Sequence, residues 1–257
     1  MKVVILAGGL GTRLREETEF RPKPMVEIGG RPILWHIMKL YAGYGHTDFV
    51  VCLGYKGDVI RTYFATYEVR NCDVTIELGS GRMEVHDAHS EAGWRVTLAE
   101  TGEKTMTGGR VKRIARFVRD QTFLATYGDG VADVDLEALL AYHRACGKLA
   151  TVTAVRPSSR FGELALEKGL ATGFHEKPQV QEGWINGGFF VLEPQVLDMI
   201  EGDQEMLEQG LLVRLTAQRQ LAVYCHDGFW QCMDTYREAE LLNELWRRGQ
   251  APWASWR

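Results

Sequence analysis

Cysteine and long apolar runs are scarce in this chain of 257 residues. Its five cysteines are odd in number and form no CxxC pair, which argues against a disulfide framework and favours free thiols in a reducing compartment. No apolar run reaches the ~18 residues of a membrane span. The apolar start, MKVVIL, is shorter than the core of a signal peptide and meets glycines instead of a cleavage site. We therefore expect a cytoplasmic protein with no membrane partner.

Positive charge is not in excess either, because 30 Lys and Arg residues stand against 34 Asp and Glu residues. The net charge of −4 argues against a nucleic-acid partner, since duplex binders usually present a basic face. Hydrophobic residues make up 45% of the chain and charged residues 25%, a globular composition that excludes disordered, collagen-like and coiled-coil proteins. Glycine, in contrast, is abundant, with 28 residues that gather in clusters.

Strand-like and helix-like patterns alternate from the first residues onward. Short apolar runs predict strands at 3–6, 49–53, 74–76, 95–98, 123–127, 149–155, 163–166, 170–174, 185–192 and 221–226. Apolar residues at helical spacing predict helices at 33–44, 58–70, 111–118, 136–146, 194–200, 206–219 and 236–248. Repeated βα units predict an α/β fold, with a Rossmann-like mixed, mostly parallel sheet flanked by helices. We find no linker or internal repeat, so we expect a single domain over residues 1–257, with an excursion near residues 80–90.

Tryptophan is concentrated at the C-terminal end, as Trp246, Trp253 and Trp256. Two interpretations stay open for this tail, residues 246–257. It docks on its own domain, or it forms a subunit interface, where tryptophan is enriched.

A glycine-rich loop follows the first expected strand, in the run Leu6-Ala7-Gly8-Gly9-Leu10-Gly11-Thr12-Arg13. Ligands of open α/β sheets bind at the carboxyl ends of strands, and glycines let backbone N–H groups approach phosphate oxygens. The run lacks the lysine of a Walker A loop and the third glycine of a dinucleotide fingerprint. A tight strand-to-helix turn is the alternative interpretation. A phosphate site is favoured by Arg13 and by Lys23, whose backbone is stiffened by a proline on either side.

The run LAGGLGTRL, followed at matching spacing by PKPMVEIGGRPILWHIM, resembles the N-terminal signature of the sugar-1-phosphate nucleotidylyltransferases. The further segments MTGGR, YGDG, EKP, INGGF and WQCMDT resemble its glucose-1-phosphate cytidylyltransferase branch, so the likeness covers essentially the whole chain. The resemblance implies transfer of the cytidylyl group of CTP to α-D-glucose 1-phosphate, giving pyrophosphate and CDP-glucose, a precursor of 3,6-dideoxyhexoses in surface polysaccharide. It also implies a Mg²⁺ cofactor and a homo-oligomer, which in this branch is a hexamer.

The resemblance also assigns residues to each substrate. The N-terminal part of the domain would bind nucleotide through Leu6, Ala7, Gly8, Gly9, Leu10, Gly11, Thr12, Arg13, Lys23, Thr105, Thr107, Gly109, Arg110 and Gly128. The sugar phosphate, bound mainly by the C-terminal part, would contact Tyr127, Glu176, Lys177, Asn186 and Gly187. Asp129 and Asp234 would hold Mg²⁺, and the residues assigned a catalytic role are Arg13, Lys23, Asp129 and Lys177.

The segment 101–110 occupies the place where related enzymes read the nucleobase. Its glycines, Gly108 and Gly109, would let the backbone approach the base, and Arg110 would reach a phosphate. The residues alone leave other interpretations open: a solvated loop at 101–110, a solvated Glu176-Lys177 pair, a surface turn at Asp129, a helix N-cap at Asp234 and a β-bulge at Asn186. The run Arg15–Thr18 departs from relatives, because it lacks their proline and places Glu16 and Glu17 near the expected triphosphate loop.

Overall fold

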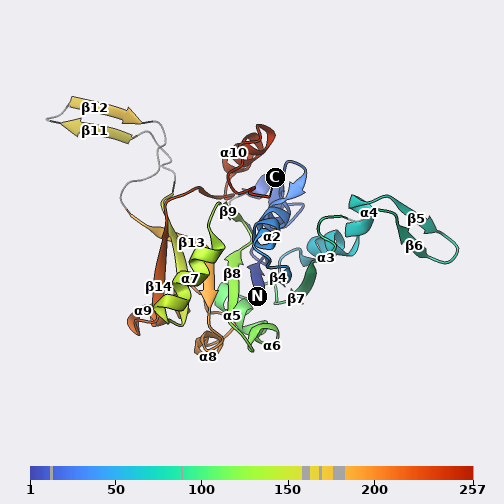
Figure 1. Ribbon diagram of the computed structural model, residues 1–257, viewed down its shortest axis with the longest axis horizontal. Helices are drawn as coiled ribbons and strands as arrows, with labels where there is room; N and C mark the ends of the chain where they lie inside the picture. The colour runs from blue at the N-terminus through green and yellow to red at the C-terminus, as the bar shows by residue number, and fades with distance from the viewer. Residues whose placement is uncertain (12–13, 88, 158–162, 168–169, 176–182, 257) are drawn as a thin grey trace.

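The computed structural model describes residues 1–11, 14–87, 89–157, 163–167, 170–175 and 183–256. Its centre is a seven-stranded sheet with the strand order β14-β10-β13-β8-β1-β4-β7 (Figure 1). These strands are β1 (Lys2–Leu6), β4 (Asp48–Leu53), β7 (Arg95–Glu100), β8 (Phe123–Tyr127), β10 (Ala150–Val155), β13 (Ile185–Leu192) and β14 (Leu221–His226). Strand β13 is antiparallel to its neighbours β8 and β10, and the other neighbouring pairs are parallel. The prediction of a mixed, mostly parallel sheet is confirmed.

Helices cover both faces of the sheet, and each face has its own apolar core. Successive residues of β1 point to opposite faces, so that Val3 and Ile5 pack in one core and Val4 and Leu6 in the other. The first core receives side chains from α2 (Ile33–Gly43), α3 (Gly57–Ala65), α4 (Tyr67–Asn71), α7 (Leu136–Cys146) and α10 (Tyr236–Arg247). The second receives side chains from α5 (Thr107–Arg113), α6 (Ala115–Val118), α8 (Val196–Met199) and α9 (Leu211–Ala217). In the part of the chain that the structure describes, no helix combines the length and the apolarity needed to cross a membrane.

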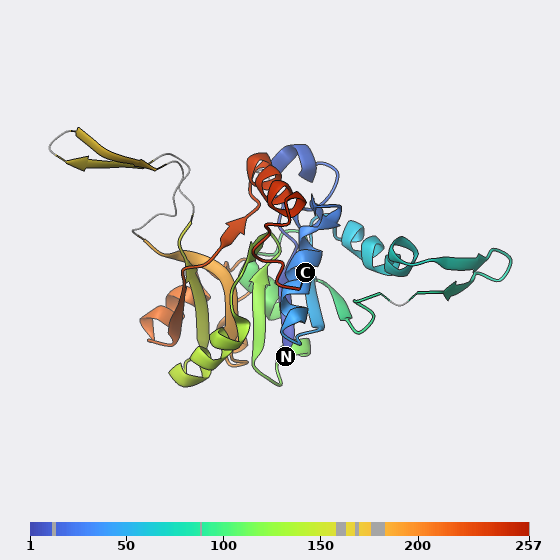
Figure 2. The same cartoon turned by 45° about the horizontal axis from the view of Figure 1, so that its top comes forward.

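Among the described residues, four short two-stranded ribbons accompany the main sheet. They are β2–β3 (Glu27–Ile28 and Arg31–Pro32), β5–β6 (Val74–Glu77 and Arg82–Val85), β9–β15 (Gly130–Ala132 and Trp230–Cys232) and β11–β12 (Glu163–Glu167 and Leu170–His175). The β5–β6 and β11–β12 ribbons project at opposite ends of the molecule in both views (Figures 1 and 2). Two single turns, α1 (Arg15–Thr18) and the 3₁₀ helix η2 (Lys23–Met25), follow the glycine-rich loop.

Several predicted boundaries were wrong. The expected helix 58–70 is divided at Thr66, whose hydroxyl donates to the carbonyl of Thr62 at 2.7 Å. The expected helix 111–118 is divided at Ile114 and already begins at Thr107. The expected strands 163–166 and 170–174 form the β11–β12 ribbon and do not join the main sheet. The expected excursion is the β5–β6 ribbon, which starts earlier, at Val74.

The expected helix 206–219 begins only at Leu211, because the segment before it packs against α5. Carbonyls of the preceding segment accept hydrogen bonds from the start of α5: Asp203 O from Met106 N at 2.8 Å, and Glu205 O from Gly109 N at 3.2 Å. The segment 203–210 is therefore a support for α5.

The aromatic tail packs onto its own domain. Trp253 is fully buried, stacks on Phe229 with ring centroids 5.6 Å apart, and its Nε1 donates to Nδ1 of His36 at 3.3 Å. The rings of Trp246 and Trp256 also face His36, at 4.6 and 6.4 Å between centroids. The tail therefore docks on its own domain, while Trp246 and Trp256 stay partly exposed. The subunit-interface interpretation of the tail stays a prediction.

Candidate active site

A cavity of about 310 Å³ opens at the carboxyl ends of β1 and β8, beside the glycine-rich loop. It is lined by Leu6, Ala7, Gly8, Gly9, Gly11, Lys23, Pro24, Thr105, Met106, Thr107, Arg110, Tyr127, Gly128, Asp129 and Asp234. Among the described residues of the expected nucleotide set, Leu10 and Gly109 are absent from this lining. Leu10 is exposed instead.

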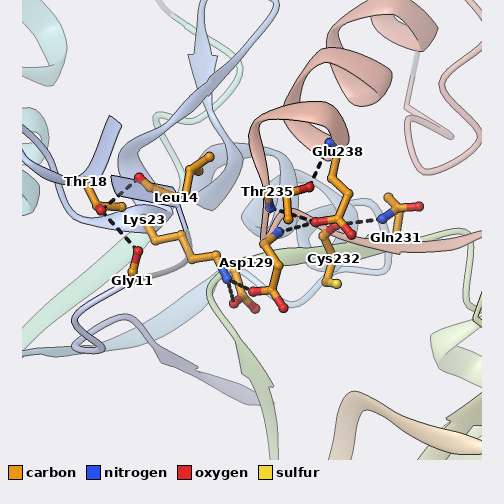
Figure 3. A network of polar contacts seen from close by, with 10 residues as sticks. Gly11, Leu14, Thr18, Lys23, Asp129, Gln231, Cys232, Thr235 and Glu238 are labelled. Atoms are coloured by element: carbon orange, nitrogen blue, oxygen red, sulfur yellow. Dashed lines mark hydrogen bonds and ion pairs between the residues drawn. The ribbon is translucent and has the colours of Figure 1, made fainter. Parts of the chain in front are cut away.

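Lys23 lies between two carboxylates in this cavity. Its Nζ donates to Oδ2 of Asp129 at 2.6 Å and also to Oδ1 of Asp234 (Figure 3). Burial alone would lower the pKa of Lys23, but the two carboxylates, Asp129 above all, hold it above its ordinary value. Lys23 is therefore an ammonium ion that neutralises a pair of carboxylates.

The β9–β15 ribbon brings the two carboxylates together. Asp129 directly precedes β9 and Asp234 follows β15. The ribbon sets Cys232 opposite Gly130, and the N–H of Met233 donates to the carbonyl of Asp129 at 2.8 Å. Two residues far apart in the sequence thus become neighbours, and Asp129 lies in a half-buried turn between β8 and β9.

Thr235, and not Asp234, is the N-cap of α10. The Thr235 side chain accepts from the N–H of Glu238, and the Glu238 carboxylate accepts in return from the N–H groups of Thr235 and Asp234 at 2.8 and 2.7 Å (Figure 3). This capping box corrects the N-cap interpretation of Asp234. The carboxylate of Asp234 is left to face Lys23 and the cavity.

The aspartate pair suits a hard divalent cation. Two carboxylates that flank the β9–β15 ribbon reach the same cationic atom, the Nζ of Lys23. Mg²⁺ in proteins is commonly held by one or two carboxylates together with substrate phosphates and water. The residues present therefore fit the divalent metal that the sequence analysis expects.

Arg110 supports the glycine-rich loop from behind. Its buried guanidinium donates to the carbonyls of Gly8, Leu53 and Gly102 at 2.8, 2.9 and 2.8 Å. A Cβ at Gly8 would lie 2.1 Å from this guanidinium, so the contact requires glycine there. These bonds hold the guanidinium against main-chain carbonyls, while Arg110 also lines the cavity. The expected contact of Arg110 with a phosphate stays a prediction.

The two adjacent glycines Gly108 and Gly109 make room for a neighbouring loop. A Cβ at Gly108 would lie 2.7 Å from the carbonyl oxygen of Glu205, and a Cβ at Gly109 would lie 2.6 Å from Cα of Asp203. This close approach gives both glycines a packing role, and the expected contact of Gly109 with the nucleobase stays a prediction. Thr105 and Thr107 do line the cavity, and residues 107–110 lie in helix α5, so the solvated-loop interpretation is wrong for them.

Tyr127 and Asn186 are joined at the side of the cavity. The amide Nδ2 of Asn186 donates to the Tyr127 hydroxyl at 3.1 Å, and its Oδ1 accepts from the N–H of Gly188 at 2.9 Å. The register between β10 and β13 shifts here, which confirms the β-bulge interpretation. Gly188 has a φ of +83°, and a Cβ there would lie 2.4 Å from the Tyr127 ring. A Cβ at Gly187 would lie 2.6 Å from Cγ1 of Val155, so both glycines serve packing.

The remaining expected residues, Thr12, Arg13, Glu176 and Lys177, lie outside the described residues. Their assignments stay predictions.

Comparison with known proteins shows the family of the chain. The family model for nucleotidyl transferases matches residues 2–235. Over the full length of both chains, the sequence is 54% identical to a glucose-1-phosphate cytidylyltransferase of Salmonella typhi and 45% identical to a probable glucose-1-phosphate cytidylyltransferase of Bacillus subtilis strain 168. The chain belongs to the nucleotidyl transferase family, in its glucose-1-phosphate cytidylyltransferase branch. It is therefore an enzyme, a transferase, as the sequence analysis predicted.

Solved structures share the fold of this cytidylyltransferase chain. HddC from Yersinia pseudotuberculosis matches with a TM-score of 0.70 at 22% identity, over 95% of this chain and 99% of that one. A UDP-glucose pyrophosphorylase in complex with UDP-glucose matches with a TM-score of 0.69 at 14% identity, over 96% of this chain and 98% of that one.

One residue beside the site was missed by the sequence analysis. Glu208 accepts hydrogen bonds from the hydroxyls of both Tyr127 and Thr107. It falls in the segment that was interpreted as the first turns of a helix, where a glutamate is unremarkable, so the sequence carried no signal for it.

Proposed function

We propose that this cytidylyltransferase transfers the cytidylyl group of CTP to α-D-glucose 1-phosphate in the cavity between the glycine-rich loop and the aspartate pair. A phosphate oxygen of the sugar phosphate bonds to the α-phosphorus of CTP, and the bond from that phosphorus to the pyrophosphate oxygen breaks. No nucleophilic side chain is needed, because the task is to position two anions and neutralise their charge. The observation that carries the proposal is the meeting of Lys23, Asp129 and Asp234 in that cavity.

The nucleotide phosphates would lie against the backbone of the glycine-rich loop. Gly8, Gly9 and Gly11 line the cavity, and a Cβ at Gly9 would meet nothing within 4 Å, so the approach to its backbone is open. Backbone N–H groups are suitable donors to phosphate oxygens. Thr105 and Thr107 offer side-chain oxygens in the same cavity for the cytosine, which presents an amine donor and a ring-nitrogen acceptor.

Asp129 and Asp234 would hold Mg²⁺, which when bound neutralises phosphate charge and orients the reacting groups. Lys23 now neutralises these carboxylates. We infer that its ammonium turns to the triphosphate when the pair takes up the cation. Arg13 would add a second cation on the triphosphate, Lys177 would bind the phosphate of the sugar, and Glu176 and Asn186 would bind its hydroxyls.

Replacing Lys23 with glutamine is expected to weaken CTP binding by about tenfold or more, because a charged hydrogen bond to phosphate is lost. Calorimetry with CTP and no sugar phosphate measures this directly. Lys148→Gln makes the same change at the end of α7, away from the cavity, and should leave the dissociation constant unaltered. An unchanged dissociation constant in Lys23→Gln would contradict the phosphate role.

The substrate assignment is tested by pyrophosphate release with glucose 1-phosphate and Mg²⁺, run separately with CTP, UTP, dTTP, ATP and GTP. We expect turnover to be fastest with CTP. Equal or faster turnover with another nucleotide would reject the assignment of CTP. Replacing Mg²⁺ with other divalent ions in the same assay tests the choice of metal, and sedimentation tests the expected homo-oligomer, a hexamer by resemblance.

A further inference from the structure

Glu208 connects two parts of the active site without lining the cavity itself. Its Oε2 accepts from the hydroxyl of Thr107 at 2.9 Å, and its Oε1 accepts from the hydroxyl of Tyr127. Thr107 and Tyr127 both line the cavity, and Glu208 does not. One half-buried carboxylate therefore holds two cavity side chains that come from different elements, α5 and β8.

On the side of α5, the hydroxyl of Thr107 is fixed by two hydrogen bonds. Its Oγ1 accepts from the N–H of Leu207 at 2.8 Å and donates to Glu208. Since the hydroxyl hydrogen points to the carboxylate, Thr107 presents to the cavity only its remaining lone pair. The nearby bond from Met106 N to Asp203 O, at 2.8 Å, holds the start of α5 against the same segment.

On the side of β8, the hydroxyl of Tyr127 is fixed in the same way. It accepts from the amide of Asn186 at 3.1 Å and donates to Glu208. The hydroxyl is the donor in its bond with Glu208, because a carboxylate offers only acceptors. Because the same hydroxyl accepts from Asn186, Glu208 also helps to fix the position of Asn186, which we assign to the sugar.

We propose that Glu208 is a positioning residue that couples the nucleotide side of the active site, through Thr107, to the sugar side, through Tyr127 and Asn186. The inference rests on the proposed function for its assignment of the two sides. The hydroxyls of Thr107 and Tyr127 donate to the same carboxylate. A displacement of either side chain therefore moves Glu208, the acceptor of the other side chain. A carboxylate can accept both bonds, whereas a glutamine amide offers one oxygen and a nitrogen that only donates.

The first test compares Glu208→Gln with the wild type. We expect the variant to bind CTP about tenfold more weakly in calorimetry without sugar phosphate, and to show a KM for glucose 1-phosphate raised by about tenfold at saturating CTP. Glu201→Gln is the matched control, because it makes the same change just before the same segment on a side chain that is 81% exposed. The control should change neither constant by more than about twofold.

The second test asks for an effect across the active site. Thr107→Val removes a hydroxyl from the nucleotide side and should still raise the KM for glucose 1-phosphate, by about threefold. Thr107→Ser keeps the hydroxyl and should have the KM of the wild type. In a Glu208→Gln background, Thr107→Val should have no further effect on this KM. A purely structural role for Glu208 would lower the melting temperature without this dependence of one variant on the other.

The outcomes separate the inference from the proposed function. A folded wild type that does not turn over CTP and glucose 1-phosphate would contradict the proposed function. With an active wild type, two results would overturn the coupling role alone. In one, Glu208→Gln keeps both the dissociation constant for CTP and the KM for glucose 1-phosphate. In the other, Thr107→Val has the same effect on this KM with and without Glu208.

Discussion

Asp129→Asn is expected to lower kcat by at least two orders of magnitude while the fold stays intact, a loss of about 3 kcal/mol or more in transition-state stabilisation. The amide keeps the shape of the carboxylate but not its charge, and a neutral oxygen holds a divalent cation poorly. Lys23 still pairs with Asp234 in this variant, so the fold has no buried ammonium without a partner. Steady-state pyrophosphate release measures kcat, and circular dichroism checks the fold.

The matched control for this variant is Asp198→Asn, on α8, where the aspartate pairs with Arg119 and is 70% exposed. It removes the same charge far from the cavity and should keep full activity. If Asp129→Asn retained near-normal turnover at saturating Mg²⁺, the assignment of the aspartate pair as the metal site would be wrong.

Trp253→Ala is expected to cost about 3–5 kcal/mol of stability, the usual range for removing a large aromatic ring from a core. The ring is fully buried between Phe229 and His36, and its N–H donates to the latter. The loss should appear as a lower midpoint of urea unfolding with the slope unchanged. Trp184→Ala is the control, because that ring is 39% exposed and faces the guanidinium of Arg156, a contact of about 1 kcal/mol. Equal losses in the two variants would contradict the docking of the tail.

The parts of the fold that the sequence could predict are those governed by local pattern. Strand β8 and helix α7 have the predicted bounds, since a short apolar run and a regular amphipathic spacing need no distant partner to be recognised. The Asp135 cap and the Gly147 end of α7 are likewise local signals. The glycine-rich loop could be placed at a ligand site because it follows a buried strand.

Other features of the site depend on distant contacts, which the sequence does not display. Arg110 looks like a free cation in the sequence, and only the fold shows its guanidinium among the carbonyls behind the loop. The packing of segment 203–210 against α5 explains two features. Helix α9 starts late, and position 109 has no room for a Cβ. Position alone allows Asp234 as the N-cap of α10. Thr235 takes this place because Glu238, three residues later, completes a capping box with it.

The β9–β15 ribbon has a consequence for how the enzyme is made. The partners of Lys23 are 106 and 211 positions away along the chain, and Asp234 reaches it only when a strand near the end of the sequence pairs with one near the middle. Closing so long a loop costs entropy that local structure cannot offset. Asp129 and Asp234 can therefore meet only after β15 has been synthesised, and a chain still emerging from the ribosome carries Asp129 without Asp234 beside it.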